Sequence, residues 1–459
     1  MFSKEEYINR RARLKANFKS GLLLFLGNEE SPINFFENTY HFRQDSSFLY
    51  YFGISAPKLA AIIDIDEDKT IVFGDEMSIE EVVWMGRQQT LEDKANQSGV
   101  GLVQLSSNLS TYLKNTQDKK RAVHFLPPYR AENKIKLASV LNLEKPSLPF
   151  IKSVVAQRSI KSVAELVELD LASSISADMH LLAMQMTKPG MKESQIAAAI
   201  QQVALKDGGN LSYPIILTVN GQILHNHYHE NTIKDGDLVL NDSGAETKMG
   251  YAGDLTRTFP AGKKFSTQQK EMYTIVLDAY TTAVEALKPG IKYLDIHYTA
   301  CLTLAEGLKE MGLMKGNMHD AIAEGAHALF FQCGTGHMMG LDVHDMEDLG
   351  EQYVGYSDEL KKNTTQFGLK SLRLGKELQT GYVLTVEPGL YFIPELIEKW
   401  KGANKFADFI NYDKVEGLKN FGGIRVEDDY VITENSYRKL GKELAVSIND
   451  IEEIREKAY

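Results

Sequence analysis

Apolar and polar positions follow different patterns in the two parts of the chain. Within about the first 150 residues, the apolar run SGLLLFLG (20–27) predicts a buried strand, and AAIIDIDEDKTIVFG (60–74) predicts two strands around a turn of Asp, Glu and Lys. In SIEEVVWMGRQQTLEDKANQ (78–97), charged residues lie between apolar ones, which predicts a helix. Together these elements predict an α/β N-terminal domain.

The pattern changes near LEKPSLPFIKSVVAQRSI (143–160), where two prolines interrupt it. From about residue 160 the chain becomes strongly helical. We therefore predict a domain boundary there, with an α/β domain over 1–160 and a second, α+β domain over 161–459.

The second part contains an internal repeat. KPGMKESQI (188–196) and KPGIKYLDI (288–296) share Lys-Pro-Gly, then an apolar residue and Lys, and both end on Ile. In each copy Pro-Gly precedes a helical run, and in the first copy Ile196, Ile200 and Val203 fall on one helix face. The similarity predicts that one helical unit occurs twice.

A strand-like segment follows each copy. GDLVLNDSG (236–244) and GYVLTVEPG (381–389) begin with Gly, continue with a β-rich run and carry an acid at the seventh place, so Asp242 and Glu387 are equivalent. Chance similarity between short β segments is the alternative. The same order of helix and strand in both copies favours a duplicated α+β unit, with a pseudo-symmetric site between its halves.

Composition narrows the class of protein. The 459 residues carry a net charge of −11, from 51 basic and 62 acidic side chains, which disfavours a broad surface for nucleic acid or anionic membranes. The N-terminal MFSKEEYINRRARLK lacks the apolar core of a signal peptide, and no stretch approaches the roughly 18 apolar residues of a membrane span. Two cysteines cannot make a disulfide framework, so we expect a cytoplasmic protein.

Several carboxylates lie in β-rich surroundings. LVLNDSGAETKMGYAGDLTRTF (238–259) places Asp242 and Asp254 on two strand-like runs joined by a Gly-containing turn, and a hairpin would bring them together. Each aspartate alone is more typical of a turn. Glu427 lies in the apolar run FGGIRVEDDYVIT (421–433), where a lone buried charge would be costly and a metal cation is one efficient partner.

The segment QCGTGHMMGLDVHD (332–345) adds one cysteine and two histidines. On its own it fits a soft Cys/His metal site, a thiol–imidazole nucleophile pair, or a site in which Cys333 takes no part. An oxygen-rich set of ligands results when one of its histidines is combined with four carboxylates, Asp242, Asp254, Glu387 and Glu427. Such a set suits two divalent ions, with Mn²⁺, Co²⁺ and Zn²⁺ as candidates. Two such ions can activate water and polarise a carbonyl, which predicts amide or ester hydrolysis.

Three histidines alternate in ILHNHYHENT (223–232). On a strand His225, His227 and His229 would share one face and could form a separate metal site. A polar loop is the favoured interpretation for His227 and His229. His225 follows an apolar pair and is the best candidate to point into a pocket.

Five segments, in this order, resemble the pita-bread metallopeptidases that cleave at proline, aminopeptidase P and the closely related prolidase. The segments are ILH, DGDLVLNDSGAETKMGYAGDLTRTFP, GTGHMMGLDVHD, LTVEPGLYF and GGIRVEDDYVIT. The resemblance spans about 185–433 and continues more weakly through HFRQDSSFLYYFG (41–53) and WMGR (84–87). It implies a pita-bread catalytic domain over 161–459, after an N-terminal domain of the aminopeptidase P type over 1–160.

The resemblance also implies roles for single residues. The expected ligands of two divalent ions are Asp242, Asp254, His337, Glu387 and Glu427, with Asp254 and Glu427 bridging. Manganese is the expected metal, and cobalt and zinc are alternatives. Glu387 is also the expected general base, and His225 and His344 match histidines that contact the substrate near the scissile carbonyl and the tetrahedral intermediate.

Three more residues match family positions. Arg425 lies two positions before Glu427 and is expected to orient metal-binding carboxylates, with a structural ion pair as the alternative. Arg373 matches the arginine that binds the substrate's terminal carboxylate in prolidase, and an ordinary surface arginine is the alternative. Trp84 matches a tryptophan that reaches a neighbouring subunit's pocket in aminopeptidase P, and a core tryptophan is the alternative.

Cys333 departs from the family pattern, which commonly has histidine at this position. It is not one of the expected ligands, so metal binding should not depend on it. We expect its effect to fall on one hydrogen bond of the pocket wall and on substrate preference, because a buried cysteine behaves mostly as a small hydrophobe.

Aminopeptidase P and prolidase differ in whether the substrate extends beyond proline. The long segment between Glu387 and Glu427, together with Arg373, favours prolidase, whereas EEYINRRARL, SGLLLFLG and FRQDSSF favour aminopeptidase P. We expect an aminopeptidase that releases the N-terminal residue from peptides with proline in second position, with prolidase as the alternative.

Two other functions occur on the same fold, a metal-free creatine hydrolase and a non-catalytic peptide- or histone-binding module. Both lack the complete ligand set, which this sequence contains, so both are disfavoured. The expected partners are proline-containing peptides and further copies of the chain, as a homodimer or homotetramer, with neither nucleic acid nor a membrane.

Overall fold

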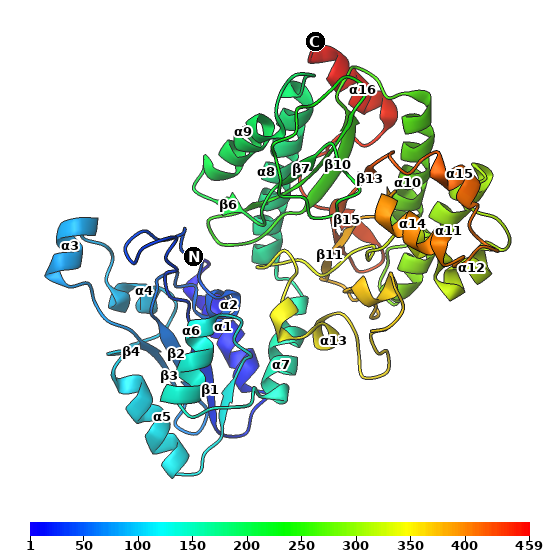
Figure 1. Ribbon diagram of the computed structural model, residues 1–459. Helices are drawn as coiled ribbons and strands as arrows, with labels where there is room; N and C mark the ends of the chain where they lie inside the picture. The colour runs from blue at the N-terminus through cyan, green and yellow to red at the C-terminus, as the bar shows by residue number, and fades with distance from the viewer. The chain divides into compact units, whose positions relative to one another are not determined.

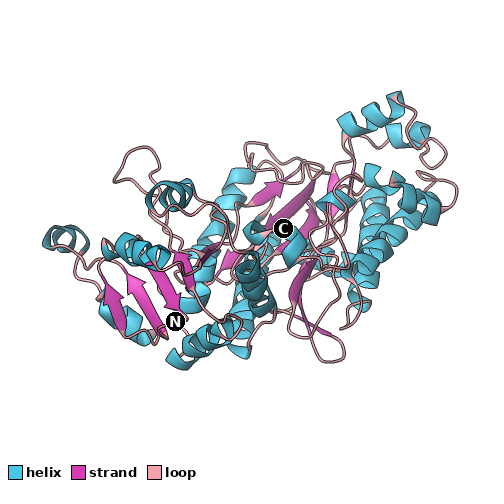
Figure 2. Cartoon of the chain, turned by 90° about the horizontal axis from the view of Figure 1, so that it is seen from below, coloured by secondary structure: helices cyan, strands magenta, loops and turns pink.

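The computed structural model describes residues 1–459, with the side chains of residues 139 and 140 excepted. The chain forms two compact units, one of Met1–Arg158 with Met346–Tyr353 and the other of Ser159–Asp345 with Val354–Tyr459. Both units contain helices and strands, and Figure 2 distinguishes helices from strands by colour. The sequence offered no sign that the short segment Met346–Tyr353 belongs with the first unit.

The first unit is built around a five-stranded mixed sheet in the order β4-β3-β2-β1-β5 (Figure 1). Its elements in chain order are α1 (Lys4–Lys15), β1 (Leu22–Leu26), α2 (Ser46–Phe52), β2 (Ala60–Asp64), β3 (Lys69–Phe73), α3 (Ile79–Met85), α4 (Leu91–Gln97), β4 (Leu102–Gln104), α5 (Asn108–Asp118), β5 (Val123–Phe125), α6 (Ala131–Ile135), the π-helix η1 (Lys136–Val140) and α7 (Leu148–Ser159). Alternate residues of β1, β2 and β3, including Leu22, Leu24, Ile62 and Phe73, pack with Leu109 and Leu113 of α5 in an apolar core.

The strands predicted from the apolar runs are confirmed, because β1, β2 and β3 lie within them and β2 pairs antiparallel with β3. The single helix predicted over 78–97 is wrong, since this segment forms the two short helices α3 and α4. Gly86 ends α3 with a φ of 73°, a backbone conformation that residues other than glycine seldom adopt. The Thr90 hydroxyl then accepts a hydrogen bond from the Asp93 amide and starts α4.

For Trp84, the alternative of a core tryptophan is wrong. Its side chain is 81% exposed on α3, a helix without a buried residue. Ile79, Val83 and Met85 of the same helix are exposed as well. The helix therefore presents an apolar surface to solvent in the single chain.

The second unit contains two three-stranded sheets, β10-β8-β7 and β11-β14-β15, and two short strand pairs, β12-β13 and β6-β9. Its elements in chain order are α8 (Val163–Met186), α9 (Glu193–Leu205), β6 (Asn210–Leu211), β7 (Ile216–Thr218), β8 (Leu238–Ser243), β9 (Ala245–Glu246), β10 (Leu255–Pro260), α10 (Thr267–Glu285), α11 (Tyr293–Glu310), α12 (Met318–Glu324), the 3₁₀-helices η2 (Ala326–Leu329) and η4 (Leu369–Ser371), β11 (Val383–Val386), β12 (Gly389–Tyr391), α14 (Pro394–Gly402), α15 (Tyr412–Glu416), β13 (Gly423–Arg425), β14 (Asp428–Ile432), β15 (Tyr437–Lys439) and α16 (Ile448–Lys457). The 3₁₀-helix η3 (Glu347–Leu349) and most of α13 (Glu351–Val354) lie in the segment Met346–Tyr353 of the first unit. Helix α8 packs against α9, and α10 lies beside α11 (Figure 1).

The duplication predicted from the sequence is present in the backbone of this unit. Gly190 and Gly290 both have a positive φ, 92° and 85°, and each lies three residues before a helix, α9 and α11 respectively. Their amides donate to the carbonyls of Ile233 and Leu378, at 2.8 and 2.9 Å. The two Lys-Pro-Gly copies therefore make the same turn and bond to equivalent segments.

The strands that follow repeat the same arrangement. Strand β8 pairs antiparallel with β10, and β11 pairs antiparallel with β14. Asp254 comes directly before β10, and Glu427 comes directly before β14. The predicted hairpin of β8 and β10 is confirmed, and each half of the unit brings two carboxylates to corresponding places.

Candidate active site

Backbone pairing between the two halves brings Asp242, Asp254 and Glu427 to one place. Thr256 of β10 lies opposite Asp242 of β8 in the antiparallel ladder. The same Thr256 forms a bridge with Glu427, whose amide donates to the Thr256 carbonyl at 3.1 Å. Strand β10 thus lies between a carboxylate of its own half and one from the other half.

A second set of backbone contacts positions His337 and Glu387. The Thr385 amide donates to the His337 carbonyl at 3.1 Å, and the His337 amide donates to the Thr385 hydroxyl at 3.2 Å. Two residues further along, the Glu387 amide donates to the Thr335 carbonyl at 2.7 Å. The irregular segment around His337 therefore runs alongside β11 and is held by it.

The side chains from these elements converge. Nε2 of His337 lies 3.3 Å from Oδ2 of Asp254 and 3.4 Å from Oε1 of Glu387. Ligand atoms of Asp254, His337 and Glu427 all lie within 4.8 Å of one another, and the three residues are buried. Nδ1 of His337 lies 3.1 Å from the Met338 carbonyl, so it must carry the proton of that hydrogen bond and leaves Nε2 for the carboxylates or a metal ion.

Arg425 of β13 joins the same cluster. Its guanidinium donates to Asp242 in a buried ion pair, to the Thr256 hydroxyl at 3.1 Å through Nε, and to the Tyr391 hydroxyl at 2.7 Å through Nη1. The Thr256 hydroxyl in turn donates to Glu427 at 2.6 Å. One arginine is therefore connected to a proposed ligand from each half of the unit.

Tyr213 was not predicted from the sequence. Its hydroxyl lies 2.6 Å from Oδ1 of Asp242 and also contacts Asp254. Because a phenol has one proton, it donates to one of these carboxylates at a time. No pattern in the sequence distinguishes Tyr213 from the other tyrosines, since its role depends on contacts with residues far along the chain.

The cluster carries more negative charge than its own residues neutralise. Burial, followed by the charges of neighbouring carboxylates, holds the pKa of Glu427 well above its ordinary range. Burial also raises the pKa of Asp242 and of Glu387, and the charge of Asp254 adds to both shifts. Such a set of buried carboxyls is stabilised by cations, so divalent metal ions fit the residues that are present.

The ion pair of Asp254 and His337 shows the same deficit of positive charge. Burial alone would raise the pKa of Asp254, but the hydrogen bond and charge of His337 outweigh burial and lower that pKa. Burial alone would lower the pKa of His337, but Asp254 and Glu387 raise it. A metal ion at Nε2 would supply positive charge to the same carboxylates.

The predicted substrate-side residues differ in how deeply they are buried. The His344 ring is half-buried and lies edge-on to the His337 ring, with their centroids 4.4 Å apart. His225 lies in an exposed turn, where partial desolvation lowers its pKa while the charge of Asp242 opposes that shift. Arg373 is half-buried and close enough to His225 to lower its pKa further.

His227 and His229 lie in irregular chain, as the loop interpretation predicted. Both rings point a nitrogen at the carbonyl of Ile215, at 3.5 and 3.1 Å, so each donates an N–H to it. The alternative of a three-histidine strand face is wrong, because residues 223–232 form no strand.

Cys333 is not part of the carboxylate–imidazole group. Its thiol points at the Tyr391 hydroxyl at 3.9 Å, a weak contact beside the Tyr391–Arg425 hydrogen bond. Burial, with the charge of Glu387, raises the pKa of Cys333 to about 12, so the thiol stays protonated at neutral pH. Because a nucleophilic cysteine needs a thiolate, the thiol–imidazole interpretation of this segment is wrong.

Comparison with known proteins identifies the family of the chain. Residues 168–434 match the family described as metallopeptidase family M24, and residues 7–124 match the aminopeptidase P N-terminal domain. The first match covers more than half of the chain.

Among the described residues, no helix is both long enough and apolar enough to cross a membrane.

Two named relatives are similar to this chain over nearly its full length. The chain is 30% identical to a Xaa-Pro aminopeptidase of Escherichia coli over 98% of its own length and 97% of the relative's. It is also 30% identical to a human Xaa-Pro dipeptidase, over 94% of its own length and 88% of the relative's. The solved structure of zinc-substituted E. coli aminopeptidase P in complex with product aligns with a TM-score of 0.80 at 28% identity and covers 100% of this chain and 99% of that one. The chain therefore belongs to metallopeptidase family M24.

Proposed function

We propose that the protein is a metal-dependent Xaa-Pro aminopeptidase, which releases the N-terminal residue from peptides with proline in second position. The observation that carries the proposal is the convergence of Asp254, His337 and Glu427, with ligand atoms within 4.8 Å of one another. Asp242 and Glu387 complete an oxygen-rich set of the kind that two divalent ions occupy. The N-terminal domain match and the full-length similarity to the E. coli Xaa-Pro aminopeptidase support aminopeptidase P specificity.

The residues that would hold the two ions are Asp242, Asp254, His337, Glu387 and Glu427. Manganese is the proposed metal, and cobalt and zinc are alternatives with the same ligand preferences. When bound, the two ions supply an activated water and polarise the carbonyl before proline. The raised pKa values of Asp242, Glu387 and Glu427 support the need for such cations.

The chain's own residues would then position the peptide and move protons. Glu387 is proposed to take the proton of the attacking water and deliver it to the proline nitrogen. His344 and His225 are proposed to donate to the scissile carbonyl as negative charge develops on its oxygen. Arg425 would hold Asp242, and through Thr256 also Glu427, in the orientation that the ions require.

Prolidase activity is the second candidate, and Arg373 is the residue that favours it. Its half-buried guanidinium lies near His225, where it could bind the terminal carboxylate of a dipeptide. Similarity to the human Xaa-Pro dipeptidase supports this alternative as well. The two activities differ in whether residues may follow proline.

Hydrolysis of matched substrates tests both candidates. The purified chain is loaded with Mn²⁺, Co²⁺ or Zn²⁺ and assayed with a Xaa-Pro dipeptide and the corresponding Xaa-Pro-Yaa tripeptides. We expect tripeptide cleavage between the first residue and proline. Cleavage of the dipeptide alone would make the protein a prolidase, and metal-loaded protein inactive on both would refute the proposal.

We also propose a cytoplasmic homodimer or homotetramer. The exposed apolar side chains of α3 (Ile79, Val83, Trp84 and Met85) support a self-association surface, with Trp84 contributing to a neighbouring subunit's substrate pocket. Light scattering of the wild type and of Trp84→Ala tests this surface. A monomeric wild type would contradict it.

A further inference from the structure

We propose that His297, Cys301 and His327 form a further metal site in the second unit, separate from the carboxylate cluster and suited to one zinc ion. The three residues are buried, and their ligand atoms all lie within 4.8 Å of one another. None of them belongs to the ligand set proposed for hydrolysis. The inference is therefore independent of the proposed function.

The geometry of the pair on α11 matches zinc coordination. His297 and Cys301 are separated by one helical turn, so they lie on the same face of α11. Sγ of Cys301 lies 3.5 Å from Nε2 of His297. A tetrahedral zinc ion with bonds of about 2.3 Å to sulfur and about 2.0 Å to nitrogen holds these two atoms about 3.5 Å apart.

The other nitrogen of His297 is already engaged. Nδ1 lies 2.8 Å from the Thr335 hydroxyl, a contact that fixes the ring with Nε2 toward the sulfur. Histidines that bind metal commonly use their second nitrogen for a hydrogen bond of this kind. The ligand-ready orientation of His297 is therefore maintained without the metal.

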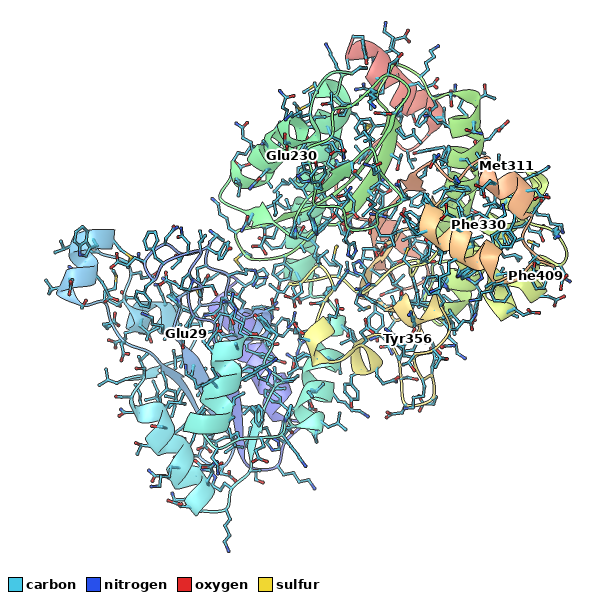
Figure 3. All side chains as sticks on the ribbon, viewed as in Figure 1. Glu29, Glu230, Met311, Phe330, Tyr356 and Phe409 are labelled. Atoms are coloured by element: carbon cyan, nitrogen blue, oxygen red, sulfur yellow. The ribbon has the colours of Figure 1, made fainter. Side chains whose placement is uncertain are left out.

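His327 supplies the strongest indication of a missing partner. It lies on η2, three positions before Phe330, which is labelled in Figure 3. The residue is 3% exposed, and neither of its ring nitrogens has a hydrogen-bond partner among the described residues. Buried polar atoms are nearly always paired, so a group is expected to bind this ring, and a metal ion is one that also accounts for the adjacent thiol and imidazole.

The donor chemistry selects the class of ion. Two imidazoles and one thiol are typical of zinc sites, and they differ from the oxygen-rich set around Asp254. Burial lowers the pKa of His297 to about 3 and of His327 to about 4, so both rings are neutral and can donate a lone pair at neutral pH. Binding would replace the Cys301 thiol proton, which leaves to solvent, and a water would complete four-coordination.

The site would also stabilise the segment that carries the hydrolytic residues. Thr335, whose hydroxyl contacts His297, accepts a hydrogen bond from the Glu387 amide through its carbonyl. It also lies two positions before His337. Fixing the His297 ring with a metal would hold this segment from its opposite side, so we expect a structural role.

Cobalt substitution tests the site, because a thiolate ligand to Co²⁺ produces a charge-transfer absorption in the near ultraviolet. The full chain is produced in minimal medium with Co²⁺, so that the ion can enter as the protein folds, and absorption is measured with total bound metal. We expect the charge-transfer band in the wild type. The wild type should also bind one cobalt per chain more than the carboxylate cluster holds. The band should disappear when Zn²⁺ replaces Co²⁺.

Matched variants locate the sulfur ligand. Cys301→Ser should lose the band and one metal equivalent, and His327→Gln should weaken both. Cys333→Ser and Asp254→Asn should keep the band, because neither residue belongs to the site. A wild type without the band while the carboxylate cluster is loaded, or a band that survives Cys301→Ser, would overturn the proposal. Circular dichroism of each variant verifies folding, and the wild-type measurement decides the matter if a variant does not fold.

Discussion

Oγ1 of Thr256 lies 2.6 Å from Oε2 of Glu427, although the two residues come from different halves of the duplicated unit. The hydroxyl donates its single proton to Glu427 and accepts from Nε of Arg425 at 3.1 Å. Arg425 also donates to Asp242. A short chain of hydrogen bonds thus links two proposed metal ligands that arise from separate copies of the repeat.

Thr256→Val should weaken metal binding. The substitution keeps the side-chain shape but removes the hydroxyl between Arg425 and Glu427, and loss of such a supporting group typically lowers metal affinity by about 10–100-fold. Isothermal titration of metal-free protein with Mn²⁺ measures the effect. Thr281→Val, at an exposed position of α10, is the control and should bind like the wild type. Equal affinities for Thr256→Val and wild type would remove Thr256 from the site.

Glu387→Ala should remove nearly all hydrolysis and leave the fold intact. The residue is proposed both as a ligand and as the proton-transferring base, and loss of a general base alone costs about 10²–10⁴ in rate. Steady-state kcat/KM for a Xaa-Pro-Yaa tripeptide and circular dichroism provide the two readouts. Glu377→Ala replaces an exposed glutamate and should be as active as wild type. Near-normal turnover of Glu387→Ala would refute its assigned role.

Arg373→Ala should separate the two substrate classes. If the guanidinium binds a terminal carboxylate next to proline, dipeptide hydrolysis should lose about tenfold in kcat/KM, equivalent to about 1.4 kcal/mol. Tripeptides, whose carboxylate lies further along, should be cleaved at nearly the wild-type rate. Arg373→Lys keeps the charge without the planar fork. Its kcat/KM for the dipeptide should lie between those of the wild type and Arg373→Ala. An equal loss for both substrates would argue for a structural role.

Arg257→Met should strongly destabilise the second unit. Arg257 and Asp428 form an ion pair in which both side chains are 0% exposed, so the substitution leaves a buried carboxylate without its main partner. Breaking such a pair typically costs about 3–5 kcal/mol. Urea unfolding measures the change. Arg438→Met breaks an exposed pair with Asp170 and should cost less than about 1 kcal/mol. Similar losses in both variants would contradict the expectation.

The same pair should make stability depend on acid pH. Burial alone would raise the pKa of Asp428, but Arg257, Lys439 and Tyr280 outweigh it, so the folded-state pKa lies below the ordinary value. The stabilisation is therefore fully present above pH of about 4 and is lost as the pH falls through the folded-state pKa. Unfolding free energies at several acid pH values should fall more steeply for the wild type than for Asp428→Asn. Parallel profiles would show that Asp428 titrates normally.

Some residues of the candidate site could be predicted from the sequence, and others could not. The resemblance to proline-specific peptidases named Asp242, Asp254, His337, Glu387 and Glu427, and the structure brings these side chains together. It did not name Tyr213 or Thr256, because a tyrosine or threonine in a β-rich segment has no distinctive spacing. His297 and Cys301 are one helical turn apart, but their partner His327 is joined to them only by packing.

The sequence by itself determined the local structure and the duplication. The apolar runs of β1, β2 and β3, and the two Lys-Pro-Gly turns, depend on neighbouring residues, so their patterns could be read directly. Gly86 shows the limit, because the charge pattern over 78–97 continues through the point where the backbone ends the helix. Only the tertiary structure decided which polar side chains are buried together. A charge, a thiol or an imidazole is buried by segments that are distant in sequence but adjacent after folding. The contacts with those segments decide the partners and the pKa of the buried group.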